Sequence, residues 1–314
     1  MRALLSPASL KGVLSARAAA AALAAGVVRG GAEAVELPVA DGGEDTADVL
    51  ERALGGEWRE ARVPDPLGRP VAARWLALPD GRAVVEAAAA VGLPLLAPAE
   101  RDPLRASSRG FGELLRAVLD TQPSSLLVGV GGVATVDGGA GMREALDALS
   151  VSTSVLCDVR TTLYEAPSVF GPQKGASPED VRELERRLRA MKELAPFADL
   201  PGSGAAGGLG AALAALGAEL APGAPAVLDL VGFDRALVVC DVVVTGEGQV
   251  DETTSAGKAP GEVARRAAAA NERCVVFGGR VLSRVEGAET VELSGDRERA
   301  EEDLVALGER LAVD

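Results

Sequence analysis

Short strands, glycine-bearing loops and helices alternate along this sequence, and that order leaves few folds open. Residues 126–130 and 238–244 are rich in valine and leucine, which is typical of parallel strands buried on both faces. Each run is followed by a loop with glycine and then by a segment of helical character. Strands that alternate with helices in this way predict an α/β fold with parallel sheet.

The N-terminal part predicts the same unit twice. Residues 3–5 form a first short strand, and Ser15 is placed to cap an alanine-rich helix that runs to about Val28. Residues 35–39 form a second strand, and a helix over residues 47–54 follows the loop of residues 40–46.

A change of pattern after residue 58 suggests a second domain. Residues 59–63 and 71–78 alternate in polarity around the turn of residues 65–68, which predicts an antiparallel hairpin. A length of 314 residues favours two domains. We therefore expect one α/β domain formed by residues 1–58 and 235–314, interrupted by a second, mixed α/β domain over residues 59–234.

The charge of the chain excludes several classes of partner. A formal charge of -14 and a pI near 4.7 disfavour nucleic acids and anionic membrane surfaces, because both need a basic footprint. Cys157, Cys240 and Cys274 are an odd number without C-x-x-C spacing, so neither a disulfide framework nor a zinc site is indicated. These features favour a cytoplasmic protein, and self-association as a homodimer is left open.

Two apolar segments could be mistaken for a signal peptide and a transmembrane helix. The N-terminus imitates a signal peptide, but Pro7, Lys11 and Arg17 interrupt its apolar stretch. Residues 200–218 carry no charge, yet they are mostly Gly, Ala and Ser with a proline, which is too weakly apolar to span a bilayer. No membrane role is expected.

The absence of histidine restricts the chemistry. Without histidine, carboxylates and lysines must supply any acid–base or charge stabilisation. Phosphoryl transfer tolerates this, because it depends mainly on positioning, backbone N–H groups, cations and a metal-bound polyphosphate. Three of the four lysines, Lys11, Lys174 and Lys258, adjoin glycine, an arrangement that suits phosphate binding but that also arises by coincidence in a glycine-rich chain.

Two glycine-rich segments are candidates for phosphate binding. Residues 128–142 place glycines around Asp137 after a strand and before a helix, where free amides suit an anion. Residues 243–258 repeat the pattern, with Thr245-Gly246-Glu247-Gly248 expected to end a strand and Pro260 to open a helix. The alternative is that the glycines allow close packing and that the carboxylates cap helices or brace their loops.

Two nucleotide-binding motifs, the Walker sequence and the Rossmann G-x-G-x-x-G, are not supported by their sequence context. The residues around Lys258 do not form a Walker sequence, because Ala259 stands where Ser or Thr is needed. Residues 202–207 satisfy G-x-G-x-x-G literally, which would suggest an NAD-dependent oxidoreductase, but residues 196–201 before them are a poor strand. A dinucleotide site there is therefore a minor alternative.

Taken together, these segments resemble the bacterial glycerate kinase family over almost the whole chain. The residues that carry the resemblance are 9–12, 38–44, 103–105 with 112–114, 134–135 with 137–142, 157–159, 169–176, 204–210, 245–248 and 257–260. Of these, Phe170-Gly171-Pro172-Gln173-Lys174-Gly175-Ala176 and Asp137-Gly138-Gly139-Ala140-Gly141-Met142 are the most specific.

The resemblance implies a flavodoxin-like domain interrupted by a second domain, and ATP- and Mg²⁺-dependent phosphorylation of glycerate or a related small hydroxy acid. It implies that Lys11 and Arg105 pair with the substrate carboxylate, and that Asp41 acts as general base or orients the attacking hydroxyl. Lys258 would neutralise charge on the transferred group. The residues expected to cradle phosphates are Gly131, Gly132, Gly138, Gly139, Gly246 and Gly248, and those expected to hold magnesium are Asp137 and Asp251.

Departures from the family pattern support a second hypothesis. Ala8, Val13, Val133 and Val136 stand where the family usually has polar residues, and a long segment is missing between Met142 and Cys157. Loss of polar contacts loosens a substrate site, and misplacement reduces rate steeply. The alternative function is a catalytically weakened member that binds nucleotide or hydroxy acid without efficient turnover.

Overall fold

The computed structural model describes residues 1–255 and 257–313. The chain divides into two compact units. Unit 1 comprises Met1–Asp41, Asp48–Ala53 and Ala224–Asp314, and unit 2 comprises Gly42–Ala47 and Leu54–Gly223. The units change over earlier than residues 59 and 235, because the strand that starts at Glu57 pairs within the second sheet and the helix from Gly223 to Leu230 packs on the first.

Unit 1 has a five-stranded sheet in the order β11-β10-β9-β1-β2, and every pair in it is parallel. The strands are β1 (Arg2–Leu5), β2 (Glu33–Glu36), β9 (Val242–Val250), β10 (Arg273–Val281) and β11 (Glu289–Glu292). The chain proceeds from β1 to one side and from β9 to the other, which is the flavodoxin-like order with its switch point between β1 and β9. The predicted parallel α/β class is confirmed for this unit.

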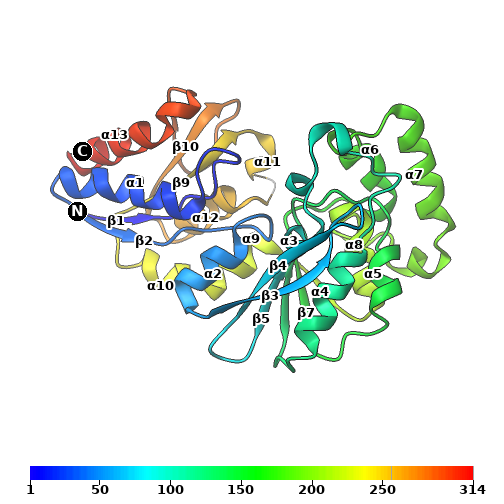
Figure 1. Ribbon diagram of the computed structural model, residues 1–314. Helices are drawn as coiled ribbons and strands as arrows, with labels where there is room; N and C mark the ends of the chain where they lie inside the picture. Colours follow the sequence, from blue (N-terminus) through cyan, green and yellow to red (C-terminus); the bar gives the residue numbers. More distant parts are fainter. Residues whose placement is uncertain (256, 314) are drawn as a thin grey trace. The chain divides into compact units, whose positions relative to one another are not determined.

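Helices cover both faces of the unit 1 sheet. Figure 1 shows α1 (Ala16–Arg29, blue) and α13 (Ala300–Val313, red) side by side, and Leu23, Leu304 and Phe277 are buried where these helices meet the strands. The other face is covered by α9 (Gly223–Leu230), α10 (Phe233–Leu237) and α12 (Ala259–Ala269). Two further helices are α2 (Thr46–Leu54) and α11 (Glu252–Ser255). The predicted cap is present, since the Ser15 Oγ accepts a hydrogen bond from the N–H of Ala18.

Unit 2 has a six-stranded mixed sheet in the order β3-β4-β5-β6-β7-β8. The strands are β3 (Glu57–Pro64), β4 (Pro70–Ala77), β5 (Ala83–Glu86), β6 (Leu126–Gly129), β7 (Thr153–Cys157) and β8 (Glu219–Pro222). The pairs β3–β4 and β4–β5 are antiparallel, which confirms the predicted hairpin, and the remaining pairs are parallel.

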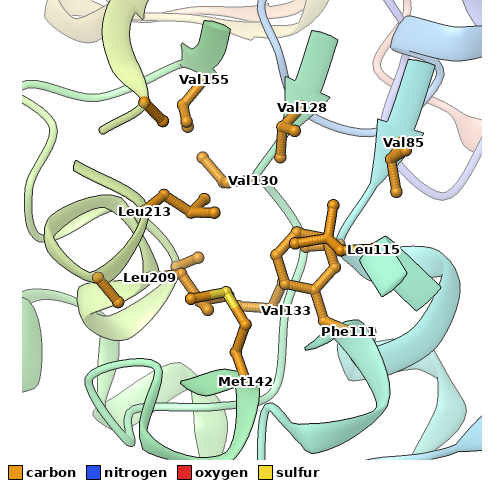
Figure 2. Close-up of a cluster of buried hydrophobic side chains, with 14 of the residues drawn as sticks. Val85, Phe111, Leu115, Val128, Val130, Val133, Met142, Val155, Leu209 and Leu213 are labelled. Carbon is orange, nitrogen blue, oxygen red and sulfur yellow. The ribbon is translucent and has the colours of Figure 1, made fainter. Parts of the chain in front are cut away.

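The helices of unit 2 enclose one large core. They are α3 (Ala88–Val91), α4 (Arg109–Leu119), α5 (Ala140–Ala145), α6 (Ala166–Phe170), α7 (Pro178–Ala190) and α8 (Ala205–Ala215). Short 3₁₀ turns cover Leu93–Leu95, Pro98–Glu100, Leu163–Glu165, Pro172–Lys174 and Lys192–Phe197 here, and Arg297–Arg299 in unit 1. Figure 2 shows Phe111 and Leu115 of α4, Met142 of α5 and Leu209 of α8 converging below Val128 of β6.

The strand expected to begin at Val238 and to end within residues 245–248 begins and ends later than expected. Val238 and Val239 precede the strand and are 67% and 54% exposed, because α10 extends the chain to Leu237 and leaves these side chains in a surface turn. The strand instead continues to Val250, because its partner β10 pairs with it as far as Val281. Residues 245–248, expected to end the strand, therefore lie inside β9, which ends two residues later.

The literal G-x-G-x-x-G of residues 202–207 has no strand before it. A 3₁₀ turn, Lys192–Phe197, precedes it, and Ala206, Gly207 and Gly208 have positive φ at the start of α8. This segment lacks the strand–turn–helix geometry of a dinucleotide site. Among the described residues, no helix has both the length and the apolar character needed to cross a membrane.

Candidate functional site

The carboxyl edge of the unit 1 sheet gathers charged side chains around Lys258. Lys258 is the N-cap residue of α12, with Pro260 in the first turn as predicted, and its Nζ lies 3.3 Å from Glu247 Oε2. Glu247 projects from β9 and also accepts a hydrogen bond of 2.7 Å from Thr254 Oγ1. The N–H of Asp251 donates in turn to Thr254 Oγ1. We call Glu247, Asp251, Thr254 and Lys258 the Lys258 cluster.

The pKa values of the two carboxylates in the Lys258 cluster are shifted in opposite directions. Burial raises the pKa of Glu247, while its bonds to Thr254 and Lys258 act in the other direction and the nearby charge of Asp41 adds to the rise. Hydrogen bonds from Thr253 and Gln249 lower the pKa of Asp251 to about 2. Asp251 is therefore ionised at neutral pH, and Glu247 is a carboxylate held by one hydroxyl and one ammonium group.

Six of the predicted site residues lie in unit 1, at or near this edge: Lys11, Asp41, Gly246, Gly248, Asp251 and Lys258. A Cβ on Gly248 would lie 3.9 Å from the backbone nitrogen of Lys11, so the β1 loop and β9 are neighbours here. Gly246 has a packing role, because a side chain there would overlap Phe277. The Lys11 side chain is exposed.

The other six predicted residues lie in unit 2: Arg105, Gly131, Gly132, Gly138, Gly139 and Asp137. Asp137 braces the loop between β6 and α5. Its Oδ2 accepts hydrogen bonds from the N–H of Ser108 at 2.8 Å, from Ser108 Oγ at 2.7 Å and from the N–H of Gly141 at 3.2 Å. Its Oδ1 accepts from the N–H of Gly139 at 3.1 Å. Protein donors therefore occupy most of the lone pairs of this carboxylate.

The glycines of this loop also make contacts within the protein. The N–H groups of Gly131 and Gly138 donate to the carbonyls of Gly42 and Gly207, at 3.4 Å and 3.0 Å. A Cβ on Gly138 would lie 2.6 Å from the sulfur of Met191. These observations support the close-packing alternative for Gly131, Gly138 and Gly139, while phosphate binding by Gly132 stays a prediction.

Lys174, which the sequence marks for phosphate binding only through its neighbouring glycine, is a buried lysine. It is 4% exposed, and its Nζ donates a hydrogen bond of 2.8 Å to the carbonyl of Thr135 in the Asp137 loop. Burial lowers the pKa of Lys174 to about 7, although Asp137 and Asp158 act in the opposite direction. The feature of the sequence that points to Lys174 is the motif Phe170–Ala176. In this motif the lysine follows a glycine-containing turn and precedes another glycine.

Other sequence departures have a packing explanation. Val133 and Val136 are 3% and 1% exposed, and Figure 2 shows Val133 among the core side chains beside Phe111 and Met142. Val13 packs against the core of unit 1 on the α1 side.

Arg105 is exposed and lies three residues before Ser108, the partner of Asp137.

Together, the units define the class of this chain: a two-domain α/β protein with a flavodoxin-like parallel sheet whose carboxyl edge carries charged groups and glycines. A profile described as the glycerate kinase family matches residues 3–151 and 147–295. The chain belongs to the glycerate kinase family. The two matched segments meet between Met142 and Cys157, where the sequence pattern predicts a missing segment.

Relatives and a solved structure agree with this assignment. The chain is 40% identical to glycerate kinase of Bacillus subtilis, over 85% of this chain and 82% of the relative. It is 38% identical to glycerate 2-kinase of Escherichia coli, over 83% of this chain and 80% of the relative. A crystal structure described as putative glycerate kinase 2 from Salmonella typhimurium LT2 superimposes with a TM-score of 0.82 at 34% identity, covering 99% of this chain and 97% of that one.

Proposed function

We propose that this protein transfers the terminal phosphoryl group of ATP to a hydroxyl of glycerate, giving phosphoglycerate and ADP. The observation that carries the proposal is the Lys258 cluster, which holds an ammonium group beside the first turn of α12 at the carboxyl edge of a parallel sheet. Helix starts and sheet edges of this kind suit phosphate groups. The similarity to proteins named glycerate kinase supports glycerate as the acceptor.

In this proposal, residues of unit 1 stabilise charge, accept a proton and bind the substrate carboxylate. Lys258 neutralises charge that develops on the transferred group, and its helix N-terminus adds a favourable dipole. Asp41 takes the proton of the attacking hydroxyl or orients that hydroxyl. Lys11 is an exposed ammonium group suited to the glycerate carboxylate. Arg105 of unit 2 stays a prediction for the same carboxylate.

Magnesium would be held mainly through the phosphates. Among residues 1–255 and 257–313, no group of three or more Asp, Glu, Cys or His side chains is arranged to hold a metal ion. Mg²⁺ usually needs only one or two carboxylates besides substrate phosphates and water, so a single carboxylate of this chain is enough for the proposal. The ionised Asp251 is the better candidate, because it lies in the Lys258 cluster and accepts three protein hydrogen bonds, whereas Asp137 accepts four in the loop before α5. When bound, the ion neutralises phosphate charge.

The decisive measurement is release of ADP from ATP in the presence of Mg²⁺ and glycerate. We expect Lys258→Ala to reduce kcat by about 100-fold or more without loss of fold, because it removes preorganised charge stabilisation. Lys192→Ala is the matched control, since Lys192 is an exposed lysine in unit 2. Wild-type turnover by Lys258→Ala would overturn the role of Lys258.

The alternative is a family member that binds nucleotide or hydroxy acid without efficient turnover. The buried valines at 133 and 136, together with the occupied amides of Gly131, Gly138 and Gly139, favour it. No glycerate-dependent ADP above background, alongside thermal stabilisation by ATP, would identify this alternative. Glycerate-dependent ADP formation with appearance of phosphoglycerate would exclude it.

A further inference from the structure

A pocket of about 160 Å³ opens at the carboxyl edge of the unit 1 sheet, on the side covered by α1 and α13. Its apolar walls come from the loop after β1, with Leu10 and Val13, and from the segment after β11, with Leu293 and Ala300. In doubly wound parallel sheets, ligands bind outside the carboxyl ends of the strands near the switch point. The pocket therefore occupies the position where this fold class binds nucleotides.

Bare backbone forms the floor of the pocket. Gly248 of β9, Gly279 of β10 and Gly295 after β11 line it. A Cβ on Gly279 would lie 2.9 Å from the Gly248 carbonyl oxygen, and Gly295 has a φ of +75° with its Cβ position 3.1 Å from the Gly279 carbonyl oxygen. Side chains at the last two positions would crowd the strand ends. The result is a floor of peptide groups against which a flat ring can lie.

One cation at the pocket is available to a ligand. Arg297 also lines the pocket, but it donates a hydrogen bond of 2.6 Å to the carbonyl of Gly12. Asp303 accepts from Ser294. Within the part of the chain that the structure describes, the Arg280 guanidinium has neither a hydrogen-bond nor an ion-pair partner, and it is exposed. In a protein of net charge -14, an uncommitted arginine beside an apolar pocket suits a ligand with a flat apolar part and a negative part.

We propose that this pocket binds the base of a nucleoside polyphosphate and that Arg280 pairs with its phosphate groups. The volume is below the range of about 300–1,000 Å³ found for drug-sized ligands, so it suits one ring system rather than a whole nucleotide. Gly248 precedes Gln249 and follows Glu247, whose carboxylate holds Lys258. Because successive strand residues face opposite sides of a sheet, the base site and the Lys258 cluster lie on opposite faces, so a nucleotide that reaches both must cross the carboxyl edge of the sheet. This inference rests on the proposed function for the identity of ATP as the nucleotide.

Calorimetry with three probes tests the two halves of the site separately. Val13→Trp should fill the pocket and weaken binding of ATP and of adenosine at least 10-fold, while inorganic tripolyphosphate binds as before. Val28→Trp is the matched control, because Val28 lies on α1 and is 62% exposed. Unchanged Kd values for ATP and adenosine in a folded Val13→Trp protein would overturn the proposal.

The arginine is tested by charge removal. Arg280→Ala should weaken ATP and tripolyphosphate about 5-fold to 10-fold and leave adenosine unchanged, as expected for an exposed cation that contacts only phosphate. Arg284→Ala is the control, since Arg284 is an exposed arginine just beyond the same strand. Equal effects of both substitutions would show a general charge effect and overturn the role of Arg280.

A third measurement does not depend on the folding of any variant. Wild-type protein photolabelled with 8-azido-ATP should yield modified peptides from residues 10–13 or 293–300, and labelling confined to other segments would overturn the pocket. If the wild type forms no phosphoglycerate but Val13→Trp abolishes ATP binding, the proposed function fails and the base site stands. If turnover proceeds and the KM for ATP is unchanged in Val13→Trp, the base site fails and the function stands.

Discussion

Replacing Lys174 with methionine should change how the stability of the protein depends on pH. In the folded protein the ammonium group is buried, with the Thr135 carbonyl as its acceptor at 2.8 Å and the Phe170 ring 5.8 Å away. Burial lowers its pKa from 10.5 to about 7, against the opposing charges of Asp137 and Asp158. The unfolded chain retains the proton up to the ordinary pKa, whereas the folded protein releases it near neutrality.

The sign of the effect follows from this difference in bound protons. Between pH 7 and pH 10 the unfolded state binds more protons than the folded state, so the free energy of unfolding rises with pH by about 1 kcal/mol per unit. Below pH 7 both states are protonated, and the burial of the charge opposes folding at a constant level. Relative to Lys174→Met, the wild type should therefore gain about 2 kcal/mol between pH 7 and pH 9.

Urea unfolding followed by tryptophan fluorescence measures this gain, because Trp58 and Trp75 are the two tryptophans and both lie in unit 2 with Lys174. The thiols of Cys157 and Cys274, whose pKa values burial raises to about 12, affect wild type and variant alike and cancel in the difference. The lost hydrogen bond to Thr135 adds an offset that does not vary with pH.

The control for this experiment is Lys192→Met, which removes an exposed lysine of the same unit and should keep the wild-type slope. Parallel stability curves for wild type and Lys174→Met from pH 7 to pH 9 would refute the reasoning. They would mean that the folded protein keeps Lys174 charged throughout this range.

Three further outcomes are expected. Glu247→Gln and Lys258→Ala should reduce turnover less than additively, with a coupling of about 1–3 kcal/mol in a double-mutant cycle, because the carboxylate holds the ammonium group; strict additivity would contradict this. Gly110→Ala should lower the free energy of unfolding by about 3 kcal/mol, because its Cβ would overlap a backbone carbonyl of β3. Gly248→Ala is the control: its Cβ would have 3.8 Å of clearance, so the free energy of unfolding should change by less than about 1 kcal/mol. Equal losses for both variants in urea titrations would contradict this packing argument. Ser15→Ala should cost about 1 kcal/mol of stability through loss of the α1 cap, and an unchanged Tm would show that the cap contributes nothing.

Local chemistry made much of the fold predictable. Ser15 and Pro260 marked helix starts because one supplies a hydroxyl acceptor and the other needs no N–H partner. The hairpin of β3 and β4 followed from its alternating polarity. These signals act within a few residues, so they can be interpreted without knowing the rest of the chain.

Long-range pairing decided the elements that sequence patterns misplaced. Val238 belongs to an aliphatic run, but its surroundings put it in a surface turn, and β9 extends through Gly246 and Gly248 because β10 supplies hydrogen-bond partners. The same limit applies to the site. Nothing near Glu247 in sequence shows that its carboxylate meets Lys258, eleven residues later, and nothing near Asp137 shows that Ser108 occupies it.

The interleaving of the two units along the chain has a consequence for biosynthesis. Segments of unit 1 lie both before and after unit 2 in the sequence, and three of its five strands, β9, β10 and β11, follow residue 241. A nascent chain that has emerged only as far as Gly223 holds every residue of unit 2 but just β1 and β2 of the other sheet. Because domains generally fold as they leave the ribosome, unit 2 can fold first, whereas β1 and β2 can complete their sheet only after β9, β10 and β11 have been synthesised.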